Sequence, residues 1–285
     1  MIKTNILEAI INISKLEDLN IDEVILGNNR AVSMGEGLES FVKNAFSNAF
    51  GIEDKNEKNK IYSQYFSYEG SKRTPPDLML KGGDALEVKK TETLSTELQL
   101  NSSHPKTKLF SNSTLINNHC RSCEDWEIKD FLYTVGHIPK NTTKLSSLWF
   151  IHGEIYAADE SVYIDLKNSV SKLLENSDDL SFSTTNEIGR INAVDPLKIT
   201  NLRVRGMWLL QPPYKAFDYV HEYDKTVSFQ TITILSTEKY LSYPIESRTK
   251  IENDNSITIK DIQVNNPNNP INLIDAKLIT FKLSE

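Results

Sequence analysis

The chain has 285 residues, of which 39% are hydrophobic and 25% are charged. This composition excludes extended disorder, because the apolar side chains suffice to bury a core. No stretch approaches the roughly 18–20 uninterrupted apolar residues of a membrane-spanning helix. The first residues place Glu8 inside an apolar run and lack the cleavage site of a secretory signal. The only two cysteines, Cys120 and Cys123, form no disulfide framework, so a cytoplasmic protein is expected.

The net charge of −7 disfavours a nucleic-acid partner, but the charge is unevenly distributed. Residues 71–144 contain eleven Lys and Arg against nine Asp and Glu, so this part is slightly positive and the remainder is acidic. Binding to DNA requires only local positive potential, because neutralised phosphates and released counterions supply the affinity. The charge therefore lowers the expectation of DNA binding without excluding it.

Two amphipathic helices are predicted near the N-terminus. Apolar residues form a broad face over residues 4–16, and a second set recurs every three or four residues from Met34 to Phe50. Ser33 is the expected N-cap of the second helix and Gly51 its expected stop. Residues 53–60 (EDKNEKNK) are predicted to be an exposed, solvated linker.

The hydrophobic period changes next and predicts a β-hairpin. Residues 77–80 and 85–89 are strand-like, and the Lys81-Gly82-Gly83-Asp84 segment between them is a tight-turn signal. Asp84 is expected to serve this turn.

The rest of the chain predicts more strands, with one further amphipathic helix over residues 159–175 and a Pro/Asn turn over residues 265–272. The expected strands cover residues 131–138, 148–157, 201–210, 228–236, 257–264 and 277–283. No internal repeat is present, and no segment marks a domain boundary. One α/β domain with a mixed sheet is therefore predicted for residues 1–285.

The hairpin also carries the most informative charges. Alternate residues of a strand share a face, so Glu87 and Lys89 project together while Val88 points to the other side. The turn brings Asp77 back beside them. Two carboxylates offer hard oxygen ligands for Mg²⁺, and a neighbouring lysine can orient or deprotonate an attacking water. This combination suits the hydrolysis of a phosphodiester.

The alternative is that these charges have no catalytic role, because Asp…Glu-x-Lys at loose spacing recurs by chance on solvated strand faces. Pro76 fixes the backbone that enters Asp77, and the otherwise apolar strands leave the three charges next to a core, where burial is costly. Both features favour the catalytic interpretation. Glu39, at the border of the apolar stripe of its helix, is either a further carboxylate of the site or a solvated residue.

Pro76-Asp77…Glu87-Val88-Lys89 resembles the PD-(D/E)XK nuclease signature. Together with its surroundings it is similar, nearly end to end, to the NgoPII family of type II restriction endonucleases. The segments that carry this resemblance are SMGEGLESFV (33–42), PPDLMLKGGDALEVKK (75–90), LNSSHPKTKL (100–109), RVRGMW (203–208) and NPNNP (266–270). His104 stands where the family has Tyr, a departure that bears on binding and spares the catalytic residues.

The resemblance implies a restriction-endonuclease-like fold, with a mixed β-sheet core flanked by helices. It implies Mg²⁺-dependent cleavage of double-stranded DNA at GGCC, leaving 5′-phosphates, usually by a homodimer that is accompanied by a cognate DNA methyltransferase. It also implies that Asp77, Glu87 and the Val88 carbonyl bind the metal, that Lys89 orients or activates the water, and that Glu39 belongs to the site.

Two polar segments are candidates for DNA contact. The segment after the catalytic hairpin is rich in hydrogen-bond donors and lacks acids, and Arg203 and Arg205 share one strand face, as suits bidentate contacts to guanine. A plain polar loop and surface ion pairs are the respective alternatives. The candidate residues are Asn101, Ser102, Ser103, Lys106, Lys108, Arg203 and Arg205.

Three other interpretations of the sequence compete with a nuclease. A noncatalytic DNA-binding or partner-binding module on a decayed nuclease fold is disfavoured by the intact trio of Asp77, Glu87 and Lys89. A small-molecule hydrolase would need a deep pocket beside the same carboxylates. A zinc site at residues 119–123 (HCRSC) lacks the further ligands that four-coordinate zinc requires.

Overall fold

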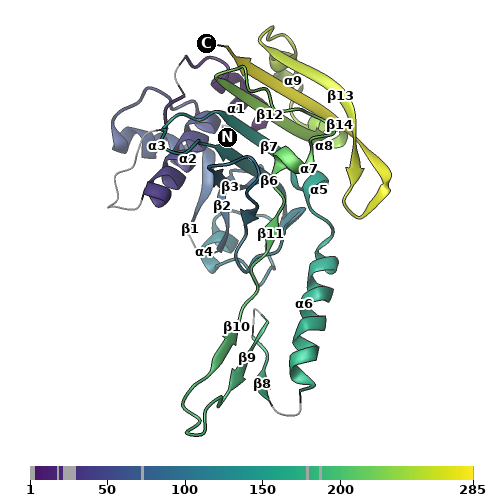
Figure 1. Cartoon of the computed structure of the whole chain (residues 1–285). Coiled ribbons are helices and arrows are strands. Elements are labelled where there is room, and N and C mark those ends of the chain that lie inside the picture. Colours follow the sequence, from purple (N-terminus) through teal and green to yellow (C-terminus); the bar gives the residue numbers. More distant parts are fainter. Residues whose placement is uncertain are drawn as a thin grey trace.

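A computed structural model describes residues 4–17, 19–21, 30–71, 74–177, 180–185 and 188–284. Within these ranges one mixed sheet of nine strands runs in the order β1-β2-β3-β6-β7-β12-β14-β13, with β5 paired to β6 (Figure 1). The pairs β3–β6 and β7–β12 are parallel, and the other neighbours are antiparallel. The expectation of a mixed-sheet α/β fold is therefore confirmed.

The strands of the large sheet include the predicted hairpin as β2 and β3. Their bounds are β1 Phe66–Ser71, β2 Thr74–Leu80, β3 Ala85–Thr91, β5 Lys108–Phe110, β6 Ile128–His137, β7 Ser147–His152, β12 Phe229–Ser236, β13 Ile257–Asn266 and β14 Asn269–Leu283.

Helices cover both faces of the sheet, and the core is correspondingly split into two apolar clusters. One cluster packs α1 (Ile6–Ile13), α2 (Arg30–Ser47), α3 (Lys55–Tyr65), α8 (Thr237–Ser242) and α9 (Ile245–Glu252) against the sheet. The other contains residues of α4 (Asn118–Ser122), α5 (Gly153–Tyr156) and α7 (Pro213–Ala216). None of the helices in the described ranges is long and apolar enough to cross a membrane.

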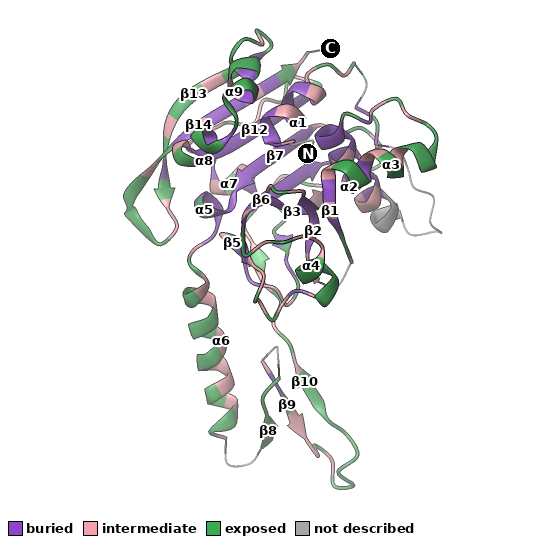
Figure 2. Ribbon diagram, turned by 180° about the vertical axis from the view of Figure 1, so that it is seen from behind, coloured by how far each residue is buried: buried purple, intermediate pink, exposed green. Residues whose placement is uncertain are grey.

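An arm projects from this body (Figure 1). It consists of α6 (Glu160–Glu175) and a three-stranded sheet of β8 (Ser181–Ser183), β9 (Gly189–Asn192) and β10 (Leu202–Val204). At its base, β11 (Leu209–Leu210) pairs with β4 (Leu98–Gln99) of the body. Figure 2 shows that the body sheet is largely buried, whereas α6 is exposed or half-buried along its length.

Several sequence predictions need correction at the helices. The second helix begins at Arg30 rather than Met34, so Ser33 lies inside it, and it ends at Ser47, before Asn48 in the left-handed region and well before Gly51. Residues 53–60 are exposed as expected but are no linker, because most of them form the first turns of α3. Asp54 caps that helix by accepting the Glu57 N–H at 2.7 Å.

The strand predictions also need three corrections. Strand β7 ends at His152 and continues into α5, so residues 153–157 are not extended. Residues 201–210 contain two short strands, β10 and β11, which belong to different sheets. Most of residues 265–272 lies within β13 and β14, and only Pro267 and Asn268 separate these strands.

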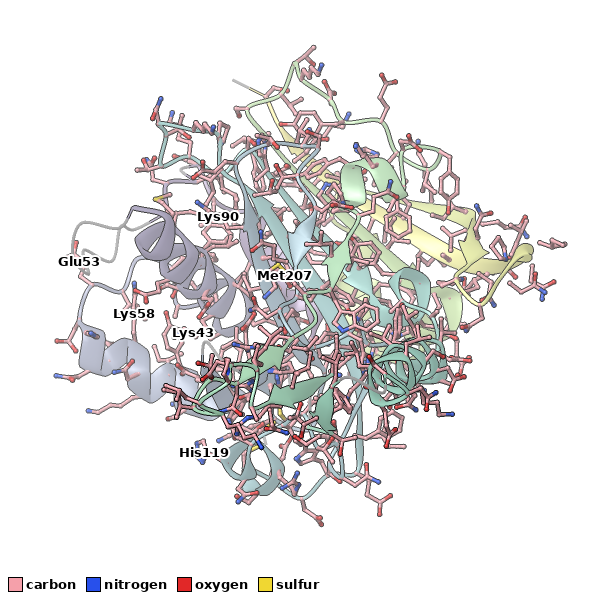
Figure 3. All side chains as sticks on the ribbon, turned by 60° about the horizontal axis from the view of Figure 1, so that its bottom comes forward. Lys43, Glu53, Lys58, Lys90, His119 and Met207 are labelled. Carbon is pink, nitrogen blue, oxygen red and sulfur yellow. The ribbon has the colours of Figure 1, made fainter. Side chains whose placement is uncertain are left out.

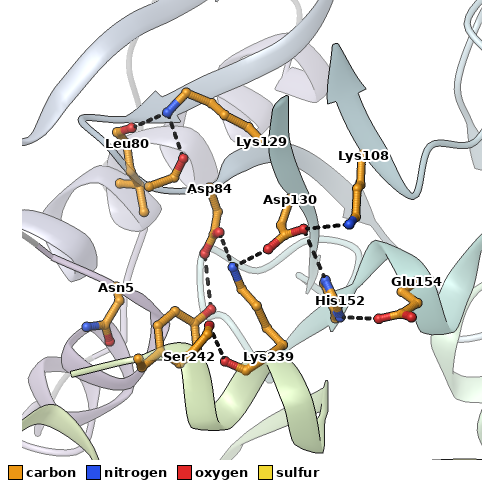
Figure 4. Close-up of polar contacts among 12 residues, drawn as sticks. Asn5, Leu80, Asp84, Lys108, Lys129, Asp130, His152, Glu154, Lys239 and Ser242 are labelled. Carbon is orange, nitrogen blue, oxygen red and sulfur yellow. Dashed lines mark hydrogen bonds and ion pairs between the residues drawn. The ribbon is translucent and has the colours of Figure 1, made fainter. Parts of the chain in front are cut away.

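A buried ion-pair network joins α8 to the hairpin (Figure 4). The Lys239 ammonium contacts the carboxylates of Asp84 and Asp130, and the Tyr243 hydroxyl donates to Asp84 at 3.1 Å. The Asp84 side chain therefore reaches across to α8 and Tyr243, whereas its main chain serves the turn as predicted, since the Asp84 carbonyl accepts the Leu80 N–H at 2.9 Å. Lys129 stabilises that turn by donating to the carbonyls of Leu80 and Gly83 at 3.0 and 2.7 Å.

Candidate active site

The hairpin strands pair at Leu78↔Leu86 and Met79↔Ala85. Main-chain pairing of β2 with β3 stops before Asp77. There the Asp77 carboxylate accepts the Val88 N–H at 2.7 Å in place of a main-chain carbonyl. The peptide bond between Pro75 and Pro76, just before Asp77, is cis. The splayed ends of β2 and β3 thus hold Asp77 beside the charged face of β3.

Lys89 lies between the two carboxylates. Its Nζ is 2.6 Å from Glu87 Oε1 and 3.9 Å from Asp77 Oδ2, and all three side chains are at least three-quarters buried. The predicted convergence of Asp77, Glu87 and Lys89 is thus present in the structure. A nearly buried group with two negative charges and one positive charge retains a net charge of about −1 when all are ionised, which favours a cation.

The electrostatics of the trio follow from this crowding. Burial, followed by the negative charge of Glu87, raises the pKa of Asp77 to about 8, against the opposing effect of Lys89. Burial alone would lower the pKa of Lys89, but the charges of Glu87 and Asp77 outweigh it and hold that pKa above its usual range. In the absence of a bound cation, Lys89 is therefore fully protonated at neutral pH.

Glu39 lies close enough to act on this group. Its charge contributes to raising the pKa values of both Asp77 and Lys89. Its helix, α2, approaches the sheet closely at Gly136 of β6, where an added Cβ would be 2.7 Å from Leu38 Cδ1. The absence of a side chain at Gly136 thus lets α2 bring Glu39 toward the trio.

The backbone at Asp77 is covered by β1. A Cβ placed on Gly70 would lie 2.3 Å from the Pro76 carbonyl oxygen and 2.9 Å from that of Asp77. Contacts this short with main-chain atoms are impossible without a shift of one strand. Gly70 therefore allows β1 to pack directly against the residue that carries the first carboxylate of the trio.

The donor set fits a hard divalent cation. Glu87 Oε2 is buried without a hydrogen-bond partner, and so is Ser103 Oγ, and both residues line a cavity of about 10 Å³. That volume corresponds to a single water-sized particle. Among the described residues, however, no group of three or more His, Cys, Asp or Glu side chains is arranged to hold a metal, so a cation here would need backbone or solvent oxygens as well.

The polar segment after the hairpin packs against this cavity. The Lys106 N–H donates to the Tyr133 hydroxyl at 2.6 Å, and that hydroxyl donates to the Lys106 carbonyl at 3.1 Å. The Lys106 side chain is buried and lines the cavity with Glu87, and burial lowers its pKa to about 8. The sequence did not predict a second lysine beside Glu87, because only the hydrogen bonds to Tyr133 bring it there.

His104 joins the same segment to the arm. Its Nε2 lies 3.2 Å from Glu160 Oε1 at the start of α6, and its ring stacks on Tyr163 with a centroid separation of 5.3 Å. Burial, followed by the charge of Lys106, lowers the pKa of His104. The residue that departs from the expected Tyr therefore lies at the base of the arm rather than in the trio.

The two segments proposed for DNA contact lie together. Main-chain hydrogen bonds of 2.8 and 2.9 Å link Trp208 with Asn101 and Leu100, and Arg205 Nη2 lies 3.4 Å from Ser102 Oγ. Met207, labelled in Figure 3, lies in the same junction at the base of the arm, between β10 and β11.

Two further cations, Lys108 and Arg190, contact other parts of the molecule. Lys108 lies apart from this junction, with its Nζ 3.9 Å from Asp130 in the network of Figure 4. Arg190 of β9 lies directly opposite Arg203 of β10, with Ser183 of β8 next in the same row. The sequence did not predict the position of Arg190 opposite Arg203, because the register of β9 and β10 cannot be read from such short strands.

Comparisons with known proteins identify the family of this chain. The NgoPII restriction endonuclease family matches residues 4–265. The chain is 39% identical to the type II restriction enzyme NgoPII of Neisseria gonorrhoeae over 98% of this chain and 100% of the relative. No solved structure is significantly similar.

Proposed function

Because this chain belongs to the NgoPII restriction endonuclease family and is therefore a type II site-specific deoxyribonuclease, we propose that Asp77, Glu87 and Lys89 form its active centre. The observation that supports this assignment is the contact of Lys89 with both carboxylates at the splayed end of β2 and β3. A small-molecule hydrolase is disfavoured, because the cavity that Glu87 lines measures only about 10 Å³ and is lined by neither Asp77 nor Lys89.

A divalent metal is implied by the family, and we propose Mg²⁺. Asp77 and Glu87 would bind it, and the Val88 carbonyl would add a third oxygen. In an extended strand the N–H and C=O of one residue point to the same side. The Val88 N–H points at Asp77, so the Val88 carbonyl also points to the side on which Asp77 lies. When bound, Mg²⁺ would supply positive charge to the phosphate oxygens and make a water molecule more acidic.

The protein groups have separate tasks in this scheme. Lys89, held protonated by its neighbours, donates hydrogen bonds that orient the attacking water and stabilise the negative charge that develops on the phosphate. Glu39 adds negative charge beside the trio, which strengthens cation binding. Water displaces the 3′ oxygen from phosphorus in this scheme, so that one fragment ends in a 3′-hydroxyl and the other in a 5′-phosphate.

We further propose that the substrate site is GGCC, that the enzyme acts as a cytoplasmic homodimer on double-stranded DNA, and that a cognate methyltransferase protects the host. A palindrome presents two equivalent half-sites, which suits two identical subunits. The segment with Asn101, Ser102 and Ser103, together with Lys106 and the arginines of the arm, is proposed to contact the DNA. Lys108 stays a prediction without further support, since it lies with Asp130.

Digestion of a plasmid tests the assignment. Pure protein with Mg²⁺ should give discrete fragments whose sequenced ends map to GGCC and carry 5′-phosphates. Asp77→Ala and Lys89→Ala should abolish cutting while an unchanged melting temperature and retained binding in Ca²⁺ show an intact fold. Uncut DNA with wild-type protein in Mg²⁺, Mn²⁺ and Co²⁺ would favour the noncatalytic module, and full activity of both variants would refute the proposed trio.

A further inference from the structure

Helix α6 is unusual among the longer helices of the fold, because none of its sixteen residues is buried. Figure 2 shows exposed and half-buried residues from one end of the helix to the other. Helices in proteins owe most of their stability to the packing of an apolar face, and an isolated helix of about 12–15 residues is only marginally stable in water. The arm therefore presents a helix that lacks most of the cover that such helices normally have.

Two faces of α6 can be distinguished by burial. The half-buried residues Tyr163, Val170 and Leu174 mark the face nearest the arm sheet and the body. About a quarter turn away, Val162, Leu166, Ser169 and Leu173 form a stripe whose members are spaced by four, three and four residues. The three apolar members of this stripe, named here the α6 seam, are 53, 55 and 74% exposed.

The spacing of the α6 seam is the one by which helices pair in coiled coils, where apolar residues alternate at intervals of three and four. A seam of this kind fits another helix with the same pattern. It does not fit DNA, because its side chains donate no hydrogen bonds to phosphates. Helix α6 is also not basic, since it carries Glu160, Asp165 and Glu175 against two lysines.

The charges beside the seam indicate which helix fits. Asp165 and Lys172 lie seven residues apart, on the same flank of the stripe. A two-fold axis between antiparallel helices brings the same flank of both into contact, so Asp165 of each copy would face Lys172 of the other. A parallel pair would instead place Asp165 and Lys172 opposite Tyr163 and Val170, which offer no ion partner.

We propose that the α6 seam is the interface through which two copies of this chain pair, antiparallel and about a two-fold axis. This inference rests on the homodimer proposed above and adds the surface that forms it. Stable interfaces bury at least ~1,000 Å², and one helix contributes the smaller part of that area. We therefore expect the free protein to pair weakly. Two copies bound to one duplex are held close together, so they should pair more strongly.

The mass of the free protein at high concentration, and of its complex with a GGCC duplex in Ca²⁺, tests the proposal. Wild-type protein should form a dimer. The double variant Leu166→Glu/Leu173→Glu should be a monomer. Ile271→Glu, which replaces a 91% exposed residue near the β13–β14 turn, is the matched control and should remain dimeric.

Charge reversal supplies a test that misfolding cannot mimic. Asp165→Lys or Lys172→Asp alone should weaken dimerisation roughly tenfold or more, because both symmetric contacts then join like charges. The double reversal should restore it. A wild-type dimer that survives the seam and single-reversal variants would refute the interface and leave the homodimer standing. A wild-type protein that is monomeric both free and on DNA would refute both.

Discussion

At the scale of single residues, the position of Asp77 depends on a neighbour without a side chain. Gly70→Ala would place a methyl group 2.3 Å from the Pro76 carbonyl oxygen, and the strand that carries Asp77 would have to move. Displacement of a reacting group by about 1 Å lowers rates by roughly 100-fold. We expect this variant to cut DNA on the order of 100-fold more slowly in single-turnover assays while retaining DNA binding in Ca²⁺.

Gly35→Ala is the matched control for this substitution. An added Cβ at Gly35 meets no atom within 4 Å, and the residue lies inside α2. The change should leave cutting unaffected and stabilise the helix by ~1 kcal/mol. Wild-type cleavage by a folded Gly70→Ala protein would show that β1 does not position Asp77.

A second residue-scale prediction concerns acid stability. The His152 ring, together with the Lys239 ammonium, holds the pKa of Asp130 below its usual range. In the unfolded chain this pKa is about 3.9. A pKa that is depressed on folding contributes stability that is complete above the unfolded value and is lost as the pH falls toward the folded one.

Urea unfolding of wild-type protein and Asp130→Asn measures this contribution. The free energy of unfolding should differ most between the two proteins at pH 6, and the difference should shrink by pH 3. Asp218→Asn, at an exposed aspartate outside the network, should show no such pH-dependent difference. An Asp130→Asn deficit of the same size at both pH values would contradict the assignment.

At the scale of elements, the sequence predicted the helices and strands that are specified by residues close together in the chain. The β2–β3 hairpin follows from a Gly-Gly turn between apolar runs, and Gly82 does adopt a positive φ of 62°. The same locality explains why Asp77, Glu87 and Lys89 were found together. Helix α3 was missed because its exposed, charged sequence has no apolar periodicity, and only tertiary contacts explain the approach of Lys106 to Glu87 and of Glu39 to Asp77.

The arm sheet yields a prediction at the same scale. Like charges directly opposite each other destabilise a strand pair, yet Arg190 and Arg203 occupy such positions on β9 and β10. The major groove admits two paired strands, here β9 and β10 of the three-stranded arm sheet. One bidentate arginine–guanine contact supplies ~1–3 kcal/mol of discrimination. Arg190→Ala and Arg203→Ala should each lower the ratio of GGCC to nonspecific affinity by roughly 10- to 100-fold.

Competition binding in Ca²⁺ with duplexes that contain or lack GGCC would measure this ratio. Lys250→Ala removes one positive charge from α9, on the opposite side of the body from the arm, and should leave the ratio unchanged (Figure 1). Equal weakening on both duplexes, with a salt slope reduced by about 1, would mean that the arginines contact phosphates instead of bases.

At the scale of the whole molecule, an acidic protein that binds DNA depends on a few local contacts. The net charge of −7 provides no general attraction for phosphates. A protein that makes 6–10 phosphate contacts loses roughly 10³–10⁵ in affinity between 50 and 200 mM salt. We expect a loss of this size in Ca²⁺ titrations, with unchanged melting temperatures as the control. An affinity that is constant over this salt range would contradict phosphate-dominated binding.

The order of strands in the sheet has a consequence for how the enzyme is made. Strands β12 and β14, from the last part of the chain, complete the sheet beside β7, and α1 near the N-terminus is bonded to α9 through Asn5 and Ser247. A nascent chain on the ribosome thus carries the hairpin long before the sheet that supports it can close. Because β12 and β14 complete the sheet beside β7, we expect a chain that terminates before β12 to cut no DNA.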